Sequence, residues 1–222
     1  MLTFNQYIQE GVNDPAIFKA VFLAGGPGSG KSFIVGKTGL VGMGYKLINS
    51  DSAFERELKK ASLEATPETI FTKKGQEIRA KAKQLTNKQM ALAIQGRLGL
   101  VIDGTGKDYM KIKNQVNSLR EIGYDVAMIF VNTDLDTAIS RDAQRPRTLG
   151  RDIVSKMWKD VQKNLGRFQN EFGRNMYIVD NSEGANYEGA SMSIYKRITQ
   201  WTKEDPKNPK AKKWIETQRK KK

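Results

Sequence analysis

Residues 25–32 read GGPGSGKS and directly follow an apolar run, IFKAVFLA, at residues 17–24. The eight residues match the pattern G-x-x-x-x-G-K-[ST], in which glycines leave room for backbone N–H groups to curl around an anion. The helix expected next would point its positive end at the same anion. A buried strand, a glycine-rich turn and a helix in this order favour an α/β architecture and predict a site for nucleotide phosphates.

Each residue type in this loop has a separate predicted role. Lys31 should reach the β- and γ-phosphates, and the Ser32 hydroxyl should ligate Mg²⁺. A dinucleotide-binding loop is excluded, because the glycines at 26, 28 and 30 follow G-x-G-x-G rather than G-x-G-x-x-G spacing. The predicted ATP-binding residues are Gly25, Gly26, Pro27, Gly28, Ser29, Gly30, Lys31 and Ser32, together with Arg147 from the lid described below.

Four more apolar runs predict buried strands, at residues 45–49, 98–103, 124–131 and 176–180. Helical spacing of apolar residues predicts helices over 109–122 and 152–172. Strands that alternate with helices pair in parallel through crossovers. The predicted fold is therefore a three-layer α/β P-loop NTPase fold with a mostly parallel five-stranded sheet.

The chain divides into three predicted parts: an N-terminal helix at 1–14, a kinase domain at 15–201 and a basic mobile tail at 202–222. Within the domain, residues 54–97 lack a strand pattern and predict a helical cap inserted between the second and third strands. Residues 141–151 are expected to form a lid. The tail contains two prolines and many lysines, so we expect it to bury little apolar surface.

Composition limits the chemistry and the partners. The chain has no cysteine and no histidine, so a general base must be a carboxylate or a lysine. No apolar run approaches the ~18 residues of a membrane helix, which predicts a cytoplasmic protein without a membrane partner. The net charge is +14, and residues 72–97 and 203–222 each contribute +6. These two windows predict contact with nucleic acid, or alternatively a solvated helix face and a free tail.

The ends of the other strands indicate the class of P-loop protein. Asp103 ends the third strand, where a carboxylate would hold the magnesium shell. Gly104 follows, at the position where many ATPases carry a glutamate that activates water. The Asn-Lys-x-Asp motif of GTPases is absent, because Asn87-Lys88 continues as Gln89-Met90. These features favour a kinase that uses ATP and Mg²⁺.

Asp51 is the candidate general base, since it follows the second strand and the carboxyl ends of parallel strands face the ligand crevice. The alternative is that Asp51 caps the next helix, as the neighbouring Ser50 and Ser52 also could.

Arginines in the 141–151 segment are the predicted cationic clamp. Arg141 and Arg145 are spaced i, i+4, so they should share one helix face and neutralise the transferring phosphoryl group. The alternative is that they are surface arginines paired with Asp134, Asp136 or Asp142.

The loop at 25–32, Asp51, the segment Asp103-Gly104-Thr105-Gly106-Lys107 and the Arg141/Arg145 pair together resemble the zeta-toxin and phage polynucleotide kinase group. The resemblance covers roughly residues 17–181 and implies a phage-encoded kinase. Zeta toxins use the segment similar to 103–107 around a sugar-nucleotide acceptor, so Thr105 and Lys107 are implied substrate-site residues. Polynucleotide kinases carry an arginine three residues after the catalytic aspartate, where this chain has Phe54.

Residues 8–10, Ile-Gln-Glu before Gly11, are similar to the cleavage signal of phage prohead proteases. A propeptide and packaging in the phage head are the alternatives to a plain N-terminal helix and the host cytoplasm.

The predicted function is ATP-dependent phosphorylation of a hydroxyl on a nucleotide, nucleotide sugar or nucleic acid. The alternatives are a DNA-associated module that binds ATP without transfer, and a packaged phage internal protein.

Overall fold

The structure, a computed structural model, describes residues 12–64, 66–145 and 148–221. Its strands are β1 (Lys19–Ala24), β2 (Lys46–Ile48), β3 (Leu100–Asp103), β4 (Asp125–Asn132) and β5 (Met176–Asp180). They form one parallel sheet in the order β2-β3-β1-β4-β5. This confirms the predicted five-stranded P-loop fold, and it places the strand before the phosphate loop at the centre of the sheet.

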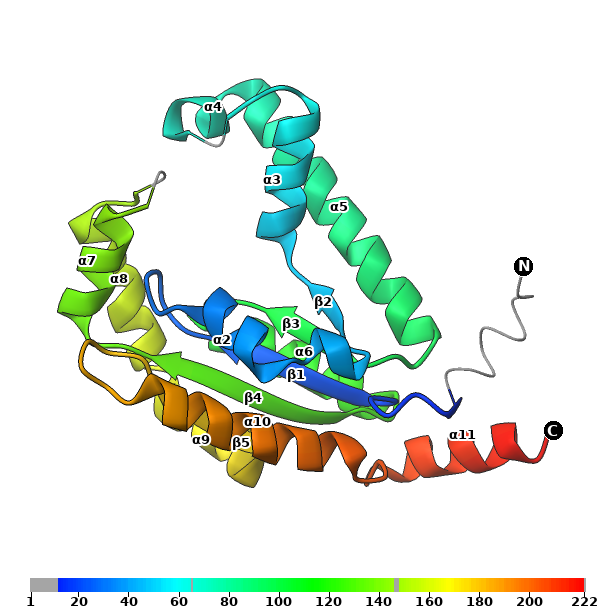
Figure 1. Ribbon diagram of the computed structural model, residues 1–222. Helices are drawn as coiled ribbons and strands as arrows, with labels where there is room; N and C mark the ends of the chain where they lie inside the picture. Colours follow the sequence, from blue (N-terminus) through cyan, green and yellow to red (C-terminus); the bar gives the residue numbers. More distant parts are fainter. Residues whose placement is uncertain (1–11, 65, 146–147, 222) are drawn as a thin grey trace.

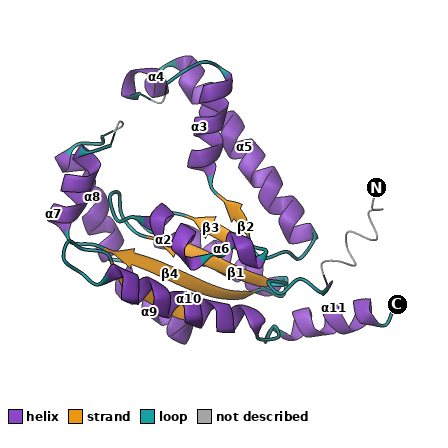
Figure 2. Cartoon of the chain, viewed as in Figure 1, coloured by secondary structure: helices purple, strands orange, loops and turns teal. Residues whose placement is uncertain are grey.

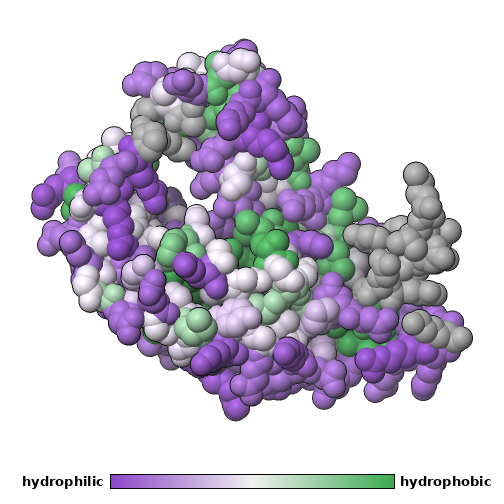
Figure 3. Space-filling model, viewed as in Figure 1, coloured by the Kyte–Doolittle hydropathy of each residue, from purple (hydrophilic) through white to green (hydrophobic). Residues whose placement is uncertain are grey.

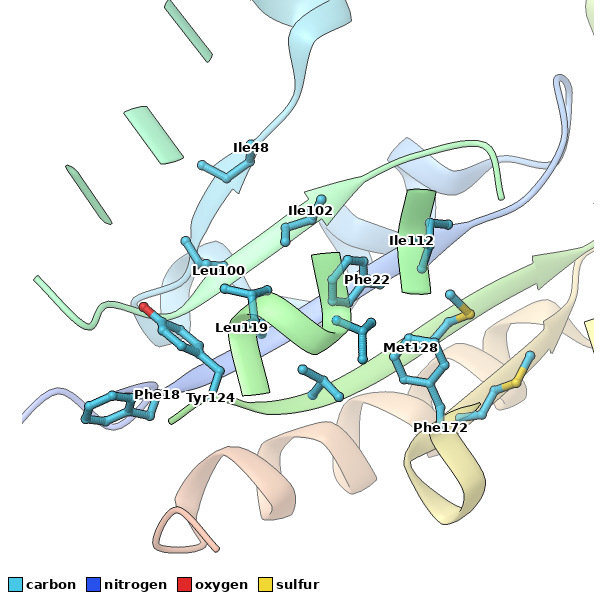
Figure 4. Close-up of a cluster of buried hydrophobic side chains, with 14 of the residues drawn as sticks. Phe18, Phe22, Ile48, Leu100, Ile102, Ile112, Leu119, Tyr124, Met128 and Phe172 are labelled. Carbon is cyan, nitrogen blue, oxygen red and sulfur yellow. The ribbon is translucent and has the colours of Figure 1, made fainter. Parts of the chain in front are cut away.

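Helices cover both faces of the sheet (Figure 2). One face carries α2 (Lys31–Thr38) and α10 (Tyr187–Lys203), and the other carries α6 (Tyr109–Glu121), α9 (Leu165–Phe172) and α11 (Pro209–Arg219). Successive residues of β1 point to opposite faces, so Val21 packs with Ile34 and Ile194 while Phe22 packs with Ile112 and Phe168. Figure 4 shows the second of these clusters, in which Phe22, Met128 and Phe172 lie together.

Three helices connect β2 to β3 and form what we call the arm: α3 (Ser50–Lys60), α4 (Pro67–Phe71) and α5 (Lys73–Gln95). Figure 1 shows the arm rising from the β2 side of the sheet, opposite α7 (Leu135–Ala143) and α8 (Arg151–Gln162). The arm has a small core of its own, made by Phe54, Leu58, Ile70 and Ala82. The short 3₁₀ turns η1 (Val41–Met43) and η2 (Gly173–Asn175) complete the helical segments.

The helix predicted over 109–122 is confirmed by α6, but the single helix predicted over 152–172 is wrong. The segment forms α8 and α9, which are separated at Lys163 and Asn164. The side chain of Asn164 is buried and donates to the carbonyl oxygens of Gly106 (3.0 Å) and Lys107 (2.9 Å). The apolar spacing continues across the break, so periodicity alone predicts one helix.

The segment predicted to be a mobile tail forms a helix that packs on the domain. In α11, Ala211 and Ile215 are buried. The ring of Trp214 meets that of Phe18 edge-on, with 5.4 Å between the ring centres. These three apolar residues recur at helical spacing, which the abundance of lysine obscures. Residues 1–11 lie outside the described residues, and with them lie most of the predicted N-terminal helix and the cleavage after Glu10. None of the described helices is long and apolar enough to cross a membrane.

Asp125 joins the first strand to the C-terminal segment. Its carboxylate lies 3.2 Å from the Nζ of Lys19, a side chain that is fully buried. The same carboxylate accepts from the backbone N–H groups of Lys207 (2.7 Å) and Asn208 (3.1 Å). Burial lowers the pKa of Lys19, and Asp125 opposes that shift. Asp125 therefore compensates a buried charge and fixes the entry to α11.

We expect Asp125→Asn to lower the free energy of unfolding by about 3–5 kcal/mol, because it leaves the Lys19 charge buried without its partner. Urea unfolding followed by tryptophan fluorescence measures this. Asp205→Asn, at an exposed aspartate of the same C-terminal segment, is the matched control and should change stability by less than about 0.5 kcal/mol. Equal effects of the two substitutions would contradict the role of Asp125.

Candidate active site

The phosphate loop is packed too closely for a side chain larger than hydrogen at Gly25, Gly28 and Gly30. Gly28 has φ 73°, and a Cβ there would lie 2.4 Å from the carbonyl oxygen of Ala138 in α7. Gly30 has φ 84°, and a Cβ there would lie 2.3 Å from the side-chain nitrogen of Asn181. The loop is therefore wedged between β1, α7 and the end of β5, which fixes where its N–H groups point.

Lys31 starts α2 and turns back into the loop. Its Nζ donates to the carbonyl oxygens of Gly25 (2.5 Å) and Gly26 (3.2 Å). Burial lowers the pKa of Lys31, Asp103 opposes the shift, Arg145 adds to it, and Asp51 opposes it. The loop lysine, both candidate carboxylates and one lid arginine thus act on one another electrostatically.

Asp103 lies at the end of β3, next to the end of β2. Ile48 pairs with Ile102, so Asn49 is level with Asp103, and its Nδ2 donates to Asp103 Oδ2 at 2.7 Å. Burial raises the pKa of Asp103, and Lys31 opposes this rise. Oδ1 of Asp103 is buried and accepts from no described residue.

Asp51 lies in the first turn of α3, and its side chain is exposed. The cap of this helix is Asn49, whose Oδ1 accepts from the backbone N–H groups of Asp51 (2.8 Å) and Ser52 (3.1 Å). Neither Asp51 nor its two serine neighbours is the N-cap. The capping alternative for Asp51 is therefore wrong, and its charge influences the pKa of Lys31 and that of Asp103.

The lid arginines are not all on one helix. α7 ends at Ala143, so Arg145 lies beyond the helix and the expected shared face is wrong. The Nη1 of Arg141 donates to the backbone oxygen of Asn181 at 2.8 Å, beside the phosphate loop. In the described parts of the chain, neither arginine forms an ion pair with Asp134, Asp136 or Asp142. Arg147 lies outside the described residues.

Asp142 organises the far side of the lid. It is buried, and its Oδ2 accepts from Thr148 Oγ1 (3.1 Å) and from the N–H groups of Leu149 (2.8 Å) and Gly150 (3.2 Å). It therefore ties the end of α7 to the start of α8. The alternative in which Asp142 pairs with Arg141 or Arg145 is therefore not met in the described residues.

The segment from Gly104 to Lys107 lies against the phosphate loop. The carbonyl oxygen of Thr105 accepts from the N–H of Gly25 at 3.0 Å, and Asn164 holds the carbonyl groups of Gly106 and Lys107. The side chain of Thr105 is half-buried and that of Lys107 is exposed. Thr105 therefore stands next to the loop that would carry the phosphates, and Lys107 follows it by two residues.

Three asparagines that the sequence analysis did not single out connect these parts: Asn49, Asn164 and Asn181. The side-chain nitrogen of Asn181 donates to the carbonyl oxygen of Ser29 at 2.8 Å, so it links the phosphate loop to Arg141. Asn49 and Asn181 directly follow strand ends. That position is a usable signal, because side chains there face the ligand crevice.

The family model of zeta toxins matches residues 8–196. The chain belongs to the zeta toxin family. It is accordingly an ATP-dependent kinase of the P-loop class. No curated protein matches the sequence.

Several solved structures resemble this zeta-toxin-family protein at low sequence identity, so they support the fold alone. The AvrRxo1-ORF1:-ORF2 structure with ATP has a TM-score of 0.59 and 15% identity, over 88% of this chain and 70% of that one. A putative kinase from Chloroflexus aurantiacus has a TM-score of 0.52 and 13% identity, over 82% and 97%. The Pnkp1/Rnl/Hen1 RNA repair complex has a TM-score of 0.52 and 18% identity, over 68% and 46%.

Asn49→Asp tests the link between the arm and Asp103. The new carboxylate can still cap α3, but it replaces the donor to Asp103 with a like charge, which raises the pKa of Asp103 further. We expect phosphoryl transfer near neutral pH to fall at least ~10-fold and to recover as the pH rises, with stability within about 1 kcal/mol of wild type. A pH–rate profile and urea unfolding measure the two effects.

Asn186→Asp is the matched control, since Asn186 caps α10 through Gly189 N–H at 3.0 Å. It should leave the pH profile unchanged. A wild-type pH profile in Asn49→Asp as well would show that the Asn49–Asp103 contact has no catalytic importance.

Proposed function

We propose that this zeta-toxin-family kinase transfers the γ-phosphoryl group of ATP to a hydroxyl of a nucleotide, a nucleotide sugar or a nucleic acid. The observation that carries the proposal is the convergence of three strand ends. Lys31 follows β1, Asp51 follows β2 and Asp103 ends β3, and both carboxylates act on the pKa of Lys31. A non-catalytic ATP-binding module would not need an exposed carboxylate opposite the phosphate loop.

In the proposed reaction, the Asp51 carboxylate accepts the proton of the acceptor hydroxyl as its oxygen bonds to the γ-phosphorus. The bond from the γ-phosphorus to the β–γ bridging oxygen breaks, and ADP leaves with that oxygen. Lys31 neutralises the phosphoryl oxygens throughout. Arg141 and Arg145 would add positive charge from the lid, together with Arg147.

Ser32 and Asp103 fit the Mg²⁺ that this family implies. The Ser32 hydroxyl is exposed at the start of α2, and Asp103 has a buried oxygen that no described residue satisfies. No group of three or more acidic side chains gathers in residues 12–64, 66–145 and 148–221, which suits a cation held mainly by phosphates and water. The bound ion would neutralise charge on the β- and γ-phosphates.

Thr105 and Lys107 are the proposed acceptor contacts on one side of the site, because the backbone of Thr105 contacts the phosphate loop and Lys107 follows it by two residues. The exposed lysines and arginines of α5 and α11 would attract a polyanionic acceptor.

Lys31→Ala tests the phosphate-binding role. It removes the cation nearest the transferring group, so turnover with ATP should fall at least ~10²-fold. Labelled-ATP transfer to a panel of nucleosides, sugar nucleotides and nucleic-acid ends measures this. Lys37→Ala, at an exposed lysine of the same helix, is the control and should retain turnover. Unchanged turnover in folded Lys31→Ala would overturn the proposed function.

Asp51→Asn separates base catalysis from nucleotide binding. It removes the proton acceptor without adding bulk, so transfer should fall ~10²-fold or more while the affinity for ATP stays within about threefold. Glu55→Gln, one turn further along α3 and also exposed, should leave both quantities unchanged. Normal transfer by Asp51→Asn would exclude Asp51 as the base.

A further inference from the structure

Asn181 directly follows β5 and is buried, with an exposed fraction of 5%. Its backbone N–H donates to the carbonyl oxygen of Asn132 at 2.9 Å, which continues the pairing of β4 with β5 by one residue. Its backbone oxygen accepts from Arg141 Nη1 (2.8 Å) and from Thr133 Oγ1 (3.1 Å). The backbone of Asn181 is therefore held in place by contacts that do not involve its own side chain.

The side chain of Asn181 is directed at the phosphate loop. Its Nδ2 donates to the carbonyl oxygen of Ser29 at 2.8 Å, in a buried contact. A Cβ on Gly30 would lie 2.3 Å from the same nitrogen, so the amide is packed directly against the next residue of the loop. The peptide group that joins Ser29 to Gly30 is thus fixed by a contact with the end of another strand.

This peptide group also supplies an N–H to the phosphate loop. None of the described peptide bonds is cis, and in a trans peptide the C=O and the N–H point in opposite directions. Because the Ser29 carbonyl points at Asn181, the Gly30 N–H points away from the buried amide. Among residues 12–64, 66–145 and 148–221 this N–H has no hydrogen-bond acceptor, so it can donate to a phosphate oxygen.

Gly30 needs such a contact because glycine does not fix its own conformation. Its φ of 84°, at the residue where the loop enters α2, lies in a region that glycine adopts as readily as others. The freedom that allows this turn is lost when the N–H takes one direction, and that loss opposes ligand binding. A contact that orients the peptide beforehand reduces the cost.

Figure 3 shows the surface hollowed between the arm and the α7–α8 side of the molecule, and the segment that joins β1 to α2 lies at the bottom of this hollow (Figure 1). Arg141 of α7 lies at the same place, since its Nη1 is 4.0 Å from where a Cβ on Gly30 would lie. In the described parts of the chain its guanidinium forms no ion pair, so no carboxylate compensates its charge. One residue, Asn181, therefore contacts both a loop peptide and a lid arginine.

We propose that Asn181 is a positioning residue for ATP: its side-chain amide orients the peptide between Ser29 and Gly30 so that the Gly30 N–H binds a phosphate oxygen. The inference rests on the proposed function only through the ATP site, and it does not depend on the identity of the acceptor.

The test measures, by calorimetry without an acceptor, the affinity of the full-length protein for ATP in the presence of Mg²⁺. Asn181→Leu keeps the approximate size and the branching of the side chain but removes the donor, while the backbone contacts of residue 181 remain. The affinity for ATP should fall roughly 10- to 100-fold, as for the loss of a hydrogen bond to a charged group. Inorganic tripolyphosphate, which has neither base nor sugar, competes with ATP for the loop and should lose affinity by a similar factor.

Asn175→Leu is the matched control. Asn175 directly precedes β5, and its Nδ2 donates to the carbonyl oxygen of Val126 at 3.3 Å. The substitution removes the same kind of bond at the opposite end of the strand, so it should lower the midpoint of urea unfolding and leave both affinities unchanged. Asn181→Asp, which keeps the shape of the side chain but has no N–H to donate, replaces Asn181→Leu if the latter does not fold.

An ATP affinity within threefold of wild type in folded Asn181→Leu would overturn the inference, and so would an equal loss in Asn175→Leu. Weaker binding of ATP with unchanged binding of tripolyphosphate, or tripolyphosphate that does not compete with ATP in wild type, would also overturn it, because the effect would then not lie at the phosphates. ATP binding that depends on Asn181, together with no phosphoryl transfer by wild type, would instead overturn the proposed function and leave this role of Asn181 standing.

Discussion

The site depends on the close packing of the phosphate loop at the end of the central strand. At Gly25, Gly28 and Gly30 a side chain would collide with β4, with α7 and with the residue after β5, respectively. The loop is therefore the place where four separate segments of the chain meet. Because each neighbour approaches a different glycine, the positions of the loop N–H groups are set by how the sheet and its helices pack.

Electrostatics then joins the arm to this loop. Lys31 and Asp103 are both half-buried, and desolvation disfavours the charged form of each, while each charge favours the other. The side chain of Asn49 makes two kinds of contact. Its Oδ1 caps α3, the first helix of the arm, and its Nδ2 donates to Asp103. The orientation of the arm and that of the proposed metal-binding carboxylate are consequently fixed by one residue.

The sequence predicted the parallel sheet, the phosphate loop and the position of Asp103 at the end of β3, because the loop motif is local and parallel pairing follows from alternating strands and helices. Asp51, expected at the end of the second strand, lies instead in the first turn of α3. The features it missed depend on single tertiary contacts. The helical spacing of apolar residues continues through the break between α8 and α9. At this break Asn164 donates to the carbonyl oxygens of Gly106 and Lys107, a tertiary contact that the spacing does not reveal. Lysine-rich composition concealed the apolar face of α11, which becomes apparent once Phe18 is seen against Trp214. The sequence suggested Ser50, Asp51 or Ser52 as the cap of α3, whereas the residue that caps the helix is Asn49.

The carboxylate of Asp125 has a consequence for how the central strand becomes stable. Lys19 lies in β1, and its buried charge has no carboxylate partner until β4 pairs beside it. The N–H groups at 207 and 208, which complete the shell of the same carboxylate, belong to the segment between α10 and α11. The environment of one residue of the central strand is therefore complete only when a segment almost two hundred residues further along the chain has docked, so unfolding of α11 alone would weaken the middle of the sheet.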